Sequence, residues 1–210
     1  MTATSDTPRA RSVPAWLLEG IFIVVSVILG FGVTQYGEYR NNRELAARAL
    51  TSLQAEIEQN LAAVTPYEPI HREWVKALAG TAESEGTRTG LGVFFATRPR
   101  LHGGAVSSFP ILRRSAWDTT VAGGALRFID YDVSTVLSEI YLLQEVYAGN
   151  IERLSNGPLA SIATFDPATR GPAVRLLVMT LRDIQGTEAG LVQLYGQHLP
   201  KVRAAAEAAR

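Results

Sequence analysis

The longest apolar run of the chain lies close to its N-terminus. Residues 20–37 hold 18 consecutive positions without a charged side chain, Trp16 precedes them, and Tyr36 and Tyr39 mark the far end. Twenty helical steps from Trp16 to Tyr36 cover about 30 Å, the thickness of the hydrocarbon core of a bilayer. Aromatic rings favour the two interfaces of a membrane. The pattern predicts a transmembrane helix over residues 15–37, with Trp16, Tyr36 and Tyr39 as interfacial anchors.

A buried core helix and a signal peptide are the alternatives for this run. A core helix does not need so long an uncharged stretch with aromatic residues at both ends. A signal peptide has a shorter apolar region that ends at a small-residue cleavage site, and no A-x-A-like site follows here. The sequence therefore favours an uncleaved single-span anchor.

Small residues recur at every fourth position of the predicted span, at Ser26, Gly30 and Thr34. On a helix they form a narrow stripe that lets a second helix approach closely, in a homodimer or in a complex with another integral membrane subunit. Glycine is common in membrane spans in any case. The span contains no His, Cys or Met, so it offers no usual axial ligand for a haem or a magnesium pigment, and we expect no cofactor.

The arginines that flank the predicted span do not decide its orientation. The N-terminal side carries Arg9 and Arg11, and the other side carries Arg40, Arg43 and Arg48. The positive-inside rule therefore favours neither side. We expect residues 1–14 to form a cytoplasmic tail and the main domain to lie on the periplasmic side of a bacterial inner membrane.

Apolar residues at three- and four-residue spacing continue directly after the span. They predict an amphipathic stalk helix over residues 38–65 that ends near Pro66 and Pro69. The positions on its apolar face are Leu50, Leu53, Ile57, Leu61 and Val64.

Residues 66–210 are predicted to form a helical bundle with a long glycine-rich loop over residues 80–110. The spacing predicts a short helix after Pro69, another over Ser115–Val121 that Gly123 and Gly124 stop, and a long helix that Asp132 caps. The last helix begins around Gly171 and Pro172, and its apolar stripe is interrupted by Glu188 and kinked or ended by Pro200. The members of that stripe are Leu177, Leu181, Ile184, Leu191, Tyr195, His198 and Val202.

No stretch alternates between apolar and polar residues with the period of two that a strand shows. The predicted fold class is therefore all-α: a single transmembrane helix that continues into the stalk and is followed by an extramembrane helical bundle.

Two features near the glycine-rich loop are candidate contacts with lipid or with a partner. The first is an apolar island that contains Leu91, Val93, Phe94 and Phe95. The second is a basic cluster made of Arg98, Arg100, Arg113 and Arg114. The structural alternatives are that the island plugs one end of the bundle and that the arginines form a solvated surface.

Charge and composition exclude several kinds of chemistry. With 20 basic and 20 acidic residues the net charge is zero, which argues against a nucleic-acid-binding protein. The absence of cysteine excludes thiol catalysis, and three histidines that are far apart in sequence do not suggest a metal site. No nucleotide-binding or serine-hydrolase motif is present. We expect a non-enzymatic protein, and an unrecognised site in the loop 80–110 is the enzymatic alternative.

Two segments together resemble a broad bacterial family of single-span membrane proteins that have a helical domain and no defined activity. The first segment is the run Tyr36-Gly-Glu-Tyr-Arg-Asn-Asn-Arg43, followed by Leu50, Leu53 and Glu56. The second is Ser115-x-Trp117-Asp118, then Gly124-Ala-Leu126, then the helix with Leu137 and Tyr141. A tyrosine stands here in place of the family's usual tryptophan after the span. The resemblance implies an architecture and no catalysis.

The sequence predicts an accessory or scaffolding subunit that stabilises a larger bacterial membrane complex, respiratory or photosynthetic. Its partners are expected to be membrane lipids and other integral membrane subunits, with no nucleic acid and no metal or other cofactor. The alternative is a membrane-tethered helical sensor or signalling module, although the chain has one predicted span and no recognisable output domain.

Overall fold

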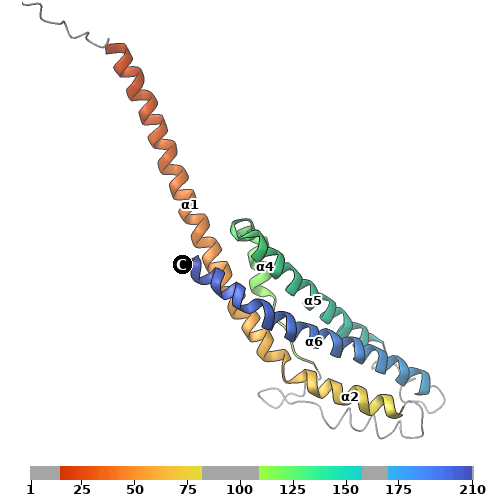
Figure 1. Ribbon diagram of the computed structural model, residues 1–210. Helices are drawn as coiled ribbons and strands as arrows, with labels where there is room; N and C mark the ends of the chain where they lie inside the picture. The colour runs from red at the N-terminus through yellow and green to blue at the C-terminus, as the bar shows by residue number, and fades with distance from the viewer. Residues whose placement is uncertain (1–14, 82–108, 158–169, 210) are drawn as a thin grey trace, which may run out of the picture. The chain divides into compact units, whose positions relative to one another are not determined.

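The computed structural model describes residues 15–81, 109–157 and 170–209, and every regular element in these ranges is a helix. The all-α prediction is therefore confirmed for this part of the chain. In chain order the elements are α1 (Ala15–Val64), α2 (Tyr67–Thr81), α4 (Ser115–Ala122), the short 3₁₀ helix η1 (Ala125–Phe128), α5 (Tyr131–Asn156) and α6 (Arg170–Ala208) (Figure 1). The predicted tail 1–14 and residues 82–108 of the predicted loop lie outside the described ranges.

The chain divides into two compact units, Met1–Arg43 and Glu44–Arg210. In the first unit, the described residues belong to α1, and large apolar side chains are exposed along it. Phe22 and Val33 are each 74 % exposed and Phe31 is 69 % exposed. Among the described residues, this is the helix that is long and apolar enough to cross a membrane, with a mean hydropathy of 1.3 over 18 residues.

The second unit, called the helical unit below, contains the hydrophobic core. The stripe predicted for the stalk contributes to that core, because Leu50, Leu53, Ile57 and Val64 are buried and Leu61 is partly buried. Helix α1 ends at Val64, just before Pro66, as the spacing predicted. The other buried apolar residues come mainly from α2, α5 and α6.

Helix α2 begins earlier than the sequence predicted. Its first residue is Tyr67, so Pro69 lies inside the first turn, whereas the prediction placed the helix after this proline. The first-turn N–H groups have no partner within a helix, so proline is tolerated there. The early start places Tyr67, His71, Trp74 and Leu78 on one buried face of α2.

The segment that leads into α5 agrees with the sequence except at the cap. Helix α4 ends at Gly123, and Gly124 adopts the left-handed conformation with φ 67°, which glycine adopts without steric cost. The cap of α5 is Asp130 and not Asp132, since the Asp130 carboxylate accepts hydrogen bonds from the backbone N–H groups of Asp132 and Val133. Asp132 lies in the first turn, where a negative charge is favourable.

Helix α6 begins at Arg170, next to the Gly171-Pro172 pair at which the sequence predicted its entry. It continues through Pro200 to Ala208, so this proline does not end the helix, and a kink at Pro200 stays a prediction. Leu199, Val202 and Ala206 are buried around this proline, and their burial offsets the backbone hydrogen bond that proline cannot form. His198, predicted on the apolar stripe, is only partly buried.

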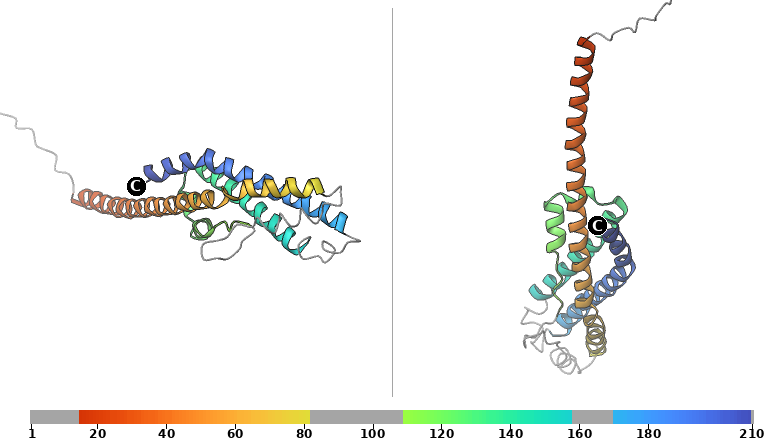
Figure 2. Two further views of the ribbon diagram at one scale, coloured as in Figure 1. Left: turned by 90° about the horizontal axis from the view of Figure 1, so that it is seen from below. Right: turned by 90° about the vertical axis from the view of Figure 1, so that its left-hand side faces the viewer.

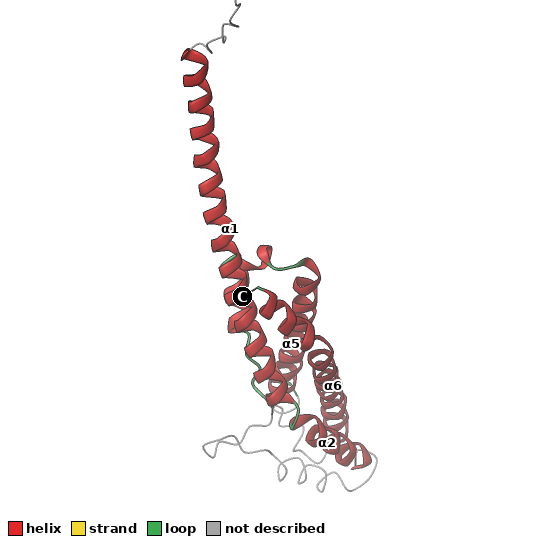
Figure 3. Ribbon diagram, turned by 60° about the vertical axis from the view of Figure 1, so that its left-hand side comes forward, coloured by secondary structure: helices red, strands yellow, loops and turns green. Residues whose placement is uncertain are grey.

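Helix α6 packs against both α5 and α2 (Figure 2). Helices α5 and α6 run in opposite directions, since Gln144 pairs with Tyr195 and Asn150 pairs with Thr187. Figure 3 shows that the elements around this contact are all helical. The facing surfaces of α2, α5 and α6 hold the main cluster of buried polar side chains.

Candidate functional site

The carboxylate of Glu188, on α6, is fully buried between α2 and α5. The hydroxyl of Tyr147, on α5, donates a hydrogen bond of 2.8 Å to its Oε1 atom. The Nδ1 atom of His71, on α2, lies 2.9 Å from Oε1 and 2.7 Å from Oε2. Both His71 and Glu188 have zero exposure. One carboxylate thus joins three helices in the interior of the helical unit.

Aromatic rings surround His71. The centroid of its ring lies 4.6 Å from that of Trp74, 4.9 Å from that of Phe109 and 5.7 Å from that of Tyr67. Tyr67 and Trp74 lie one turn before and nearly one turn after His71 on the same face of α2, so the spacing of the helix builds part of this environment. The rings keep water away from the contact between His71 and Glu188.

The electrostatics of the cluster keep Tyr147 protonated. Burial raises the pKa of the Tyr147 hydroxyl far above its usual range, and the negative charge and hydrogen bond of Glu188 raise it further. The hydroxyl therefore remains a donor to the carboxylate. A buried carboxylate is tolerated when its oxygens accept such hydrogen bonds, and removing its partners is costly.

A second buried carboxylate, that of Glu56 on α1, caps α4. The first turn of α4 has no side-chain cap of its own. Glu56 accepts the backbone N–H of Ala116 at 2.8 Å and that of Trp117 at 3.3 Å, together with the Ser115 hydroxyl at 3.0 Å. The two backbone N–H groups are among those that a helix N-terminus leaves without a partner, and a negative charge is favoured there.

Tyr141, on α5, completes the environment of Glu56. Its hydroxyl donates to Glu56 Oε1 at 2.7 Å, and its ring stacks on Trp117 with a centroid distance of 4.7 Å. Burial raises the pKa of Tyr141, and the hydrogen bond to Glu56 raises it further. One turn along α1, the side-chain amide of Asn60 both accepts from the backbone N–H and donates to the backbone C=O of Arg113, each at 2.7 Å. Residues 113–117 are thereby fixed to α1.

A cleft of about 390 Å³ opens between the segment before α4 and helix α5. Its lining is mainly apolar and includes the polar residues Arg114, Gln144 and Tyr147. The apolar part consists of Phe109, Pro110, Ile111, Leu112, Ala148 and Ile151. We call it the α5 cleft. It reaches the buried network, because Tyr147 belongs to both.

Gln144, which lines the α5 cleft, has a side-chain carbonyl oxygen that accepts no hydrogen bond within the described residues. It is 5 % exposed, and its Nε2 atom donates to the Tyr195 hydroxyl at 2.8 Å. Among the described residues none donates a hydrogen bond to its side-chain carbonyl oxygen. Burial raises the pKa of Tyr195 above its usual range, although the hydrogen bond from Gln144 lowers it.

A second hollow of about 430 Å³ lies between α1 and α4, and we call it the α1–α4 groove. Small side chains dominate its lining, and Leu45 and Arg48 lie at one end. The small residues and the hydroxyl-bearing ones are Ala49, Ser52, Ser115, Ala116, Thr119, Thr120, Gly123 and Ala125. Small residues let another backbone approach closely, so the groove suits a protein segment.

The small-residue stripe predicted in the span lies on the exposed surface of α1. The hydroxyls of Ser26 and Thr34 donate to the backbone carbonyls of Phe22 and Gly30, at 2.8 and 3.1 Å. In the part of the chain that the structure describes, no side chain or other segment lies within 4 Å of the position that a Cβ on Gly30 would take. The stripe therefore presents a narrow surface of small groups whose polar atoms are satisfied within the helix.

The predicted interfacial anchors all belong to α1. Tyr36 and Tyr39 are exposed, and the guanidinium of Arg43 lies 5.8 Å from the centroid of the Tyr39 ring. Trp16 is part of the first turn of α1, and its side chain is not among those described.

The predicted contact residues of the loop fall into two groups. The apolar island Leu91, Val93, Phe94 and Phe95, with Arg98 and Arg100, lies outside the described residues. Arg113 and Arg114 are described and exposed. Arg114 forms an ion pair with Asp118 at 3.1 Å and lies 3.9 Å from Glu145, so acidic side chains compensate its charge.

Sequence reasoning missed the two buried carboxylates. It treated Glu188 as an interruption of the apolar stripe and did not assign Glu56 or Asn60 to the core. The available signal was their register, since Glu188 keeps the helical spacing of Ile184 and Leu191. Across the described ranges no group of three metal-ligating side chains comes together.

Comparisons with known proteins give no match: no family model, no curated protein and no solved structure is similar to this chain. The resemblance to single-span bacterial proteins therefore stays a prediction, and the assignment of function depends on the chain's own geometry.

Proposed function

We propose that this protein is a non-enzymatic, single-span accessory subunit of a larger bacterial membrane complex. One observation carries the proposal: apolar side chains such as Phe22, Phe31 and Val33 are exposed along a helix that has no charge between residues 20 and 37. Exposed apolar surface of this extent is stable when lipid or another protein covers it. In this proposal residues 15–37 cross the inner membrane and the helical unit is a bundle on the periplasmic side.

The interior of the helical unit supports a docking role. Its buried carboxylates, Glu56 and Glu188, each accept hydrogen bonds from neighbouring helices. Such buried polar contacts favour one arrangement of helices over alternatives. A fixed arrangement gives a partner subunit a preformed surface, which lowers the entropic cost of association.

Two surfaces are available for that partner. In the span, the stripe of Ser26, Gly30 and Thr34 suits another transmembrane helix. In the helical unit, the α1–α4 groove suits an extramembrane segment. The two surfaces lie in different units and are tested separately.

Affinity purification from native membranes in a mild detergent tests the proposal, with a matched pair of variants for each surface. In the span, Gly30→Ile blocks the stripe, and Gly32→Ile is the control because it points about 200° away around the helix. In the groove, Ser52→Trp fills the lining, and Thr51→Trp places the same ring on an exposed position outside it.

We expect the wild-type chain to retain a stoichiometric partner, and we expect at least one blocking variant to lose it while its control retains it. A wild-type chain that purifies alone, or blocking variants that behave like their controls, would contradict the proposal.

A membrane-tethered sensor is the second candidate, and the α5 cleft is the observation that favours it. Clefts of about 300–1,000 Å³ with an apolar lining and a few polar groups are typical of small-molecule sites. Binding of a small ligand with no stable protein partner would favour this candidate over the accessory subunit.

A further inference from the structure

We infer that the α5 cleft binds a small, largely apolar, uncharged molecule that carries a hydroxyl or N–H donor. The inference goes beyond the docking role. It proposes a ligand class for the sensor candidate, and the biological meaning of such binding rests on that candidate. Four features of the cleft support this inference: its apolar lining, its free hydrogen-bond acceptor, the charges at its rim and its volume.

The lining and the free acceptor define the kind of molecule. Leu112, Ala148 and Ile151 provide apolar walls, which favour an apolar body. The carbonyl oxygen of Gln144 accepts no hydrogen bond within the described chain, although the residue is 5 % exposed. A buried acceptor without a partner is unfavourable, so a ligand that donates to it gains the interaction the protein leaves open.

Tyr147, which also lines the cleft, has an oxygen that can accept a further hydrogen bond. Its hydroxyl hydrogen is directed to Glu188, which leaves the lone pairs of its oxygen for a donor. Gln144 and Tyr147 lie about one helical turn apart on α5, so they are neighbours on one face. The free acceptors of these two residues therefore favour a ligand that donates a hydrogen bond.

The charge at the rim excludes an anionic ligand. Arg114 lines the cleft, but Asp118 lies 3.1 Å and Glu145 lies 3.9 Å from its guanidinium nitrogens. One positive and two negative groups leave no positive field for a carboxylate or phosphate. The volume of about 390 Å³ suits a single aromatic or aliphatic ring system.

Titration calorimetry with phenol and toluene tests the inference on the full chain in lipid nanodiscs. The two probes have nearly the same shape, and only phenol has a donor. Ala148→Phe fills the cleft and serves as the blank for uptake of the probes by lipid, because Ala148 is exposed on the lining. After subtraction of this blank, we expect saturable binding of both probes.

A pair of variants then isolates the role of the carbonyl oxygen. Gln144→Leu removes the acceptor and also the hydrogen bond to Tyr195, whereas Tyr195→Phe removes that hydrogen bond and keeps the acceptor. We expect the ratio of the toluene Kd to the phenol Kd to fall by about fivefold in Gln144→Leu, the effect of one hydrogen bond. The ratio should be unchanged in Tyr195→Phe.

Benzoate, which adds a negative charge to a similar ring, is titrated as a third probe. Three results would overturn the inference: no binding above the Ala148→Phe blank, the same ratio of toluene Kd to phenol Kd in Gln144→Leu as in wild type, or tighter binding of benzoate than of phenol. If Gln144→Leu does not fold, nitrogen-15 NMR of the wild-type chain tests the role of Gln144 in binding. The side-chain amide signal of Gln144 should shift with phenol far more than with toluene, and equal shifts would refute the role of Gln144.

Discussion

His71 and Glu188 are 117 positions apart in the sequence, and their side chains meet at 2.7 Å with no exposure to solvent. The contact ties α2 to α6, and Tyr147 extends it to α5. From the sequence, Glu188 was interpreted as an interruption of the apolar stripe of the last helix. In the structure its carboxylate is the group that joins three helices.

Replacement of Glu188 by alanine should strongly destabilise the helical unit. It removes the carboxylate to which the Tyr147 hydroxyl donates and beside which His71 lies, and a buried donor that loses its acceptor costs about 1–3 kcal/mol. Denaturant unfolding followed by circular dichroism measures the change. The control is Glu73→Ala, which removes an exposed ion pair with Lys76 and should change the free energy of unfolding by less than about 1 kcal/mol. Equal effects of the two variants would show that the buried contact does not hold the helices together.

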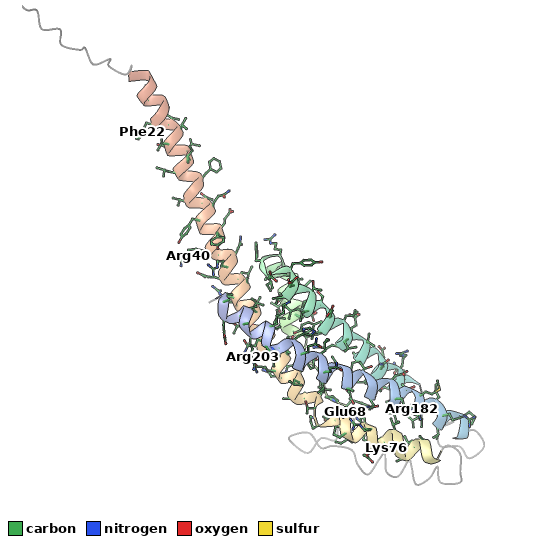
Figure 4. All side chains as sticks on the ribbon, in the orientation of Figure 1. Phe22, Arg40, Glu68, Lys76, Arg182 and Arg203 are labelled. Atoms are coloured by element: carbon green, nitrogen blue, oxygen red, sulfur yellow. The ribbon has the colours of Figure 1, made fainter. Side chains whose placement is uncertain are left out.

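Replacement of Glu56 by alanine should release the first turn of α4. The backbone N–H groups of Ala116 and Trp117 lose their acceptor, so hydrogen exchange at these two amides should accelerate. Glu58→Ala is the matched control, since that residue lies two positions along α1 and pairs with Arg203 on α6. Arg203 is labelled in Figure 4. Unchanged exchange at Ala116 in the Glu56→Ala chain would contradict the capping role.

Stability should fall as the solution becomes acidic, and Glu58 and Glu68 contribute to this fall. Hydrogen bonds from Gln54 and Arg203 hold the pKa of Glu58 below its ordinary 4.5. Burial alone would raise the pKa of Glu68, but hydrogen bonds from Arg72 and Gln185 lower it below 4.5.

A carboxyl group that binds protons more weakly in the folded chain stabilises it above the unfolded pKa, and this stability is lost as the pH falls through the lower folded pKa. The free energy of unfolding should therefore decrease below pH 4.5. The decrease should be smaller in Glu68→Gln. A variant curve as steep as that of wild type would refute the contribution of Glu68.

Three tyrosines should resist ionisation in the folded chain. Burial, as the main cause, raises the pKa of Tyr141, Tyr147 and Tyr195 above the usual range. In a spectrophotometric titration to about pH 11, one unit above the ordinary tyrosine pKa, at least three of the seven tyrosines should stay protonated. All seven should ionise in denaturant, and full ionisation of the native chain at that pH would contradict the burial of these hydroxyls.

Local patterns of the sequence predicted the helices well and their polar contacts poorly. The buried stripes of α1 and α6 and the stop of α4 at Gly123 follow from spacing and glycine, which act over a few residues. The cap of α5 was misplaced by two positions because Asp130 and Asp132 are both good caps, and only the backbone geometry distinguishes them. The sequence did not show that the helix continues past Pro200, because the burial on both sides of this proline depends on packing between helices.

The partners of Glu56 and Glu188 were beyond sequence reasoning for a related reason. Their donors come from residues 41 to 117 positions away, and no local rule selects those pairs. The sequence does show an ionisable residue at a position that belongs to the apolar face of a helix. Such a residue indicates a buried partner on a neighbouring helix.

Native mass spectrometry of the full chain, purified from its own membranes in a mild detergent, tests the proposed function most directly. We predict that the chain stays in the membrane fraction after an alkaline carbonate wash and is then released by detergent as part of a stoichiometric assembly with at least one other integral membrane protein. Release by carbonate, or a detergent-solubilised species that contains this chain alone, would contradict it.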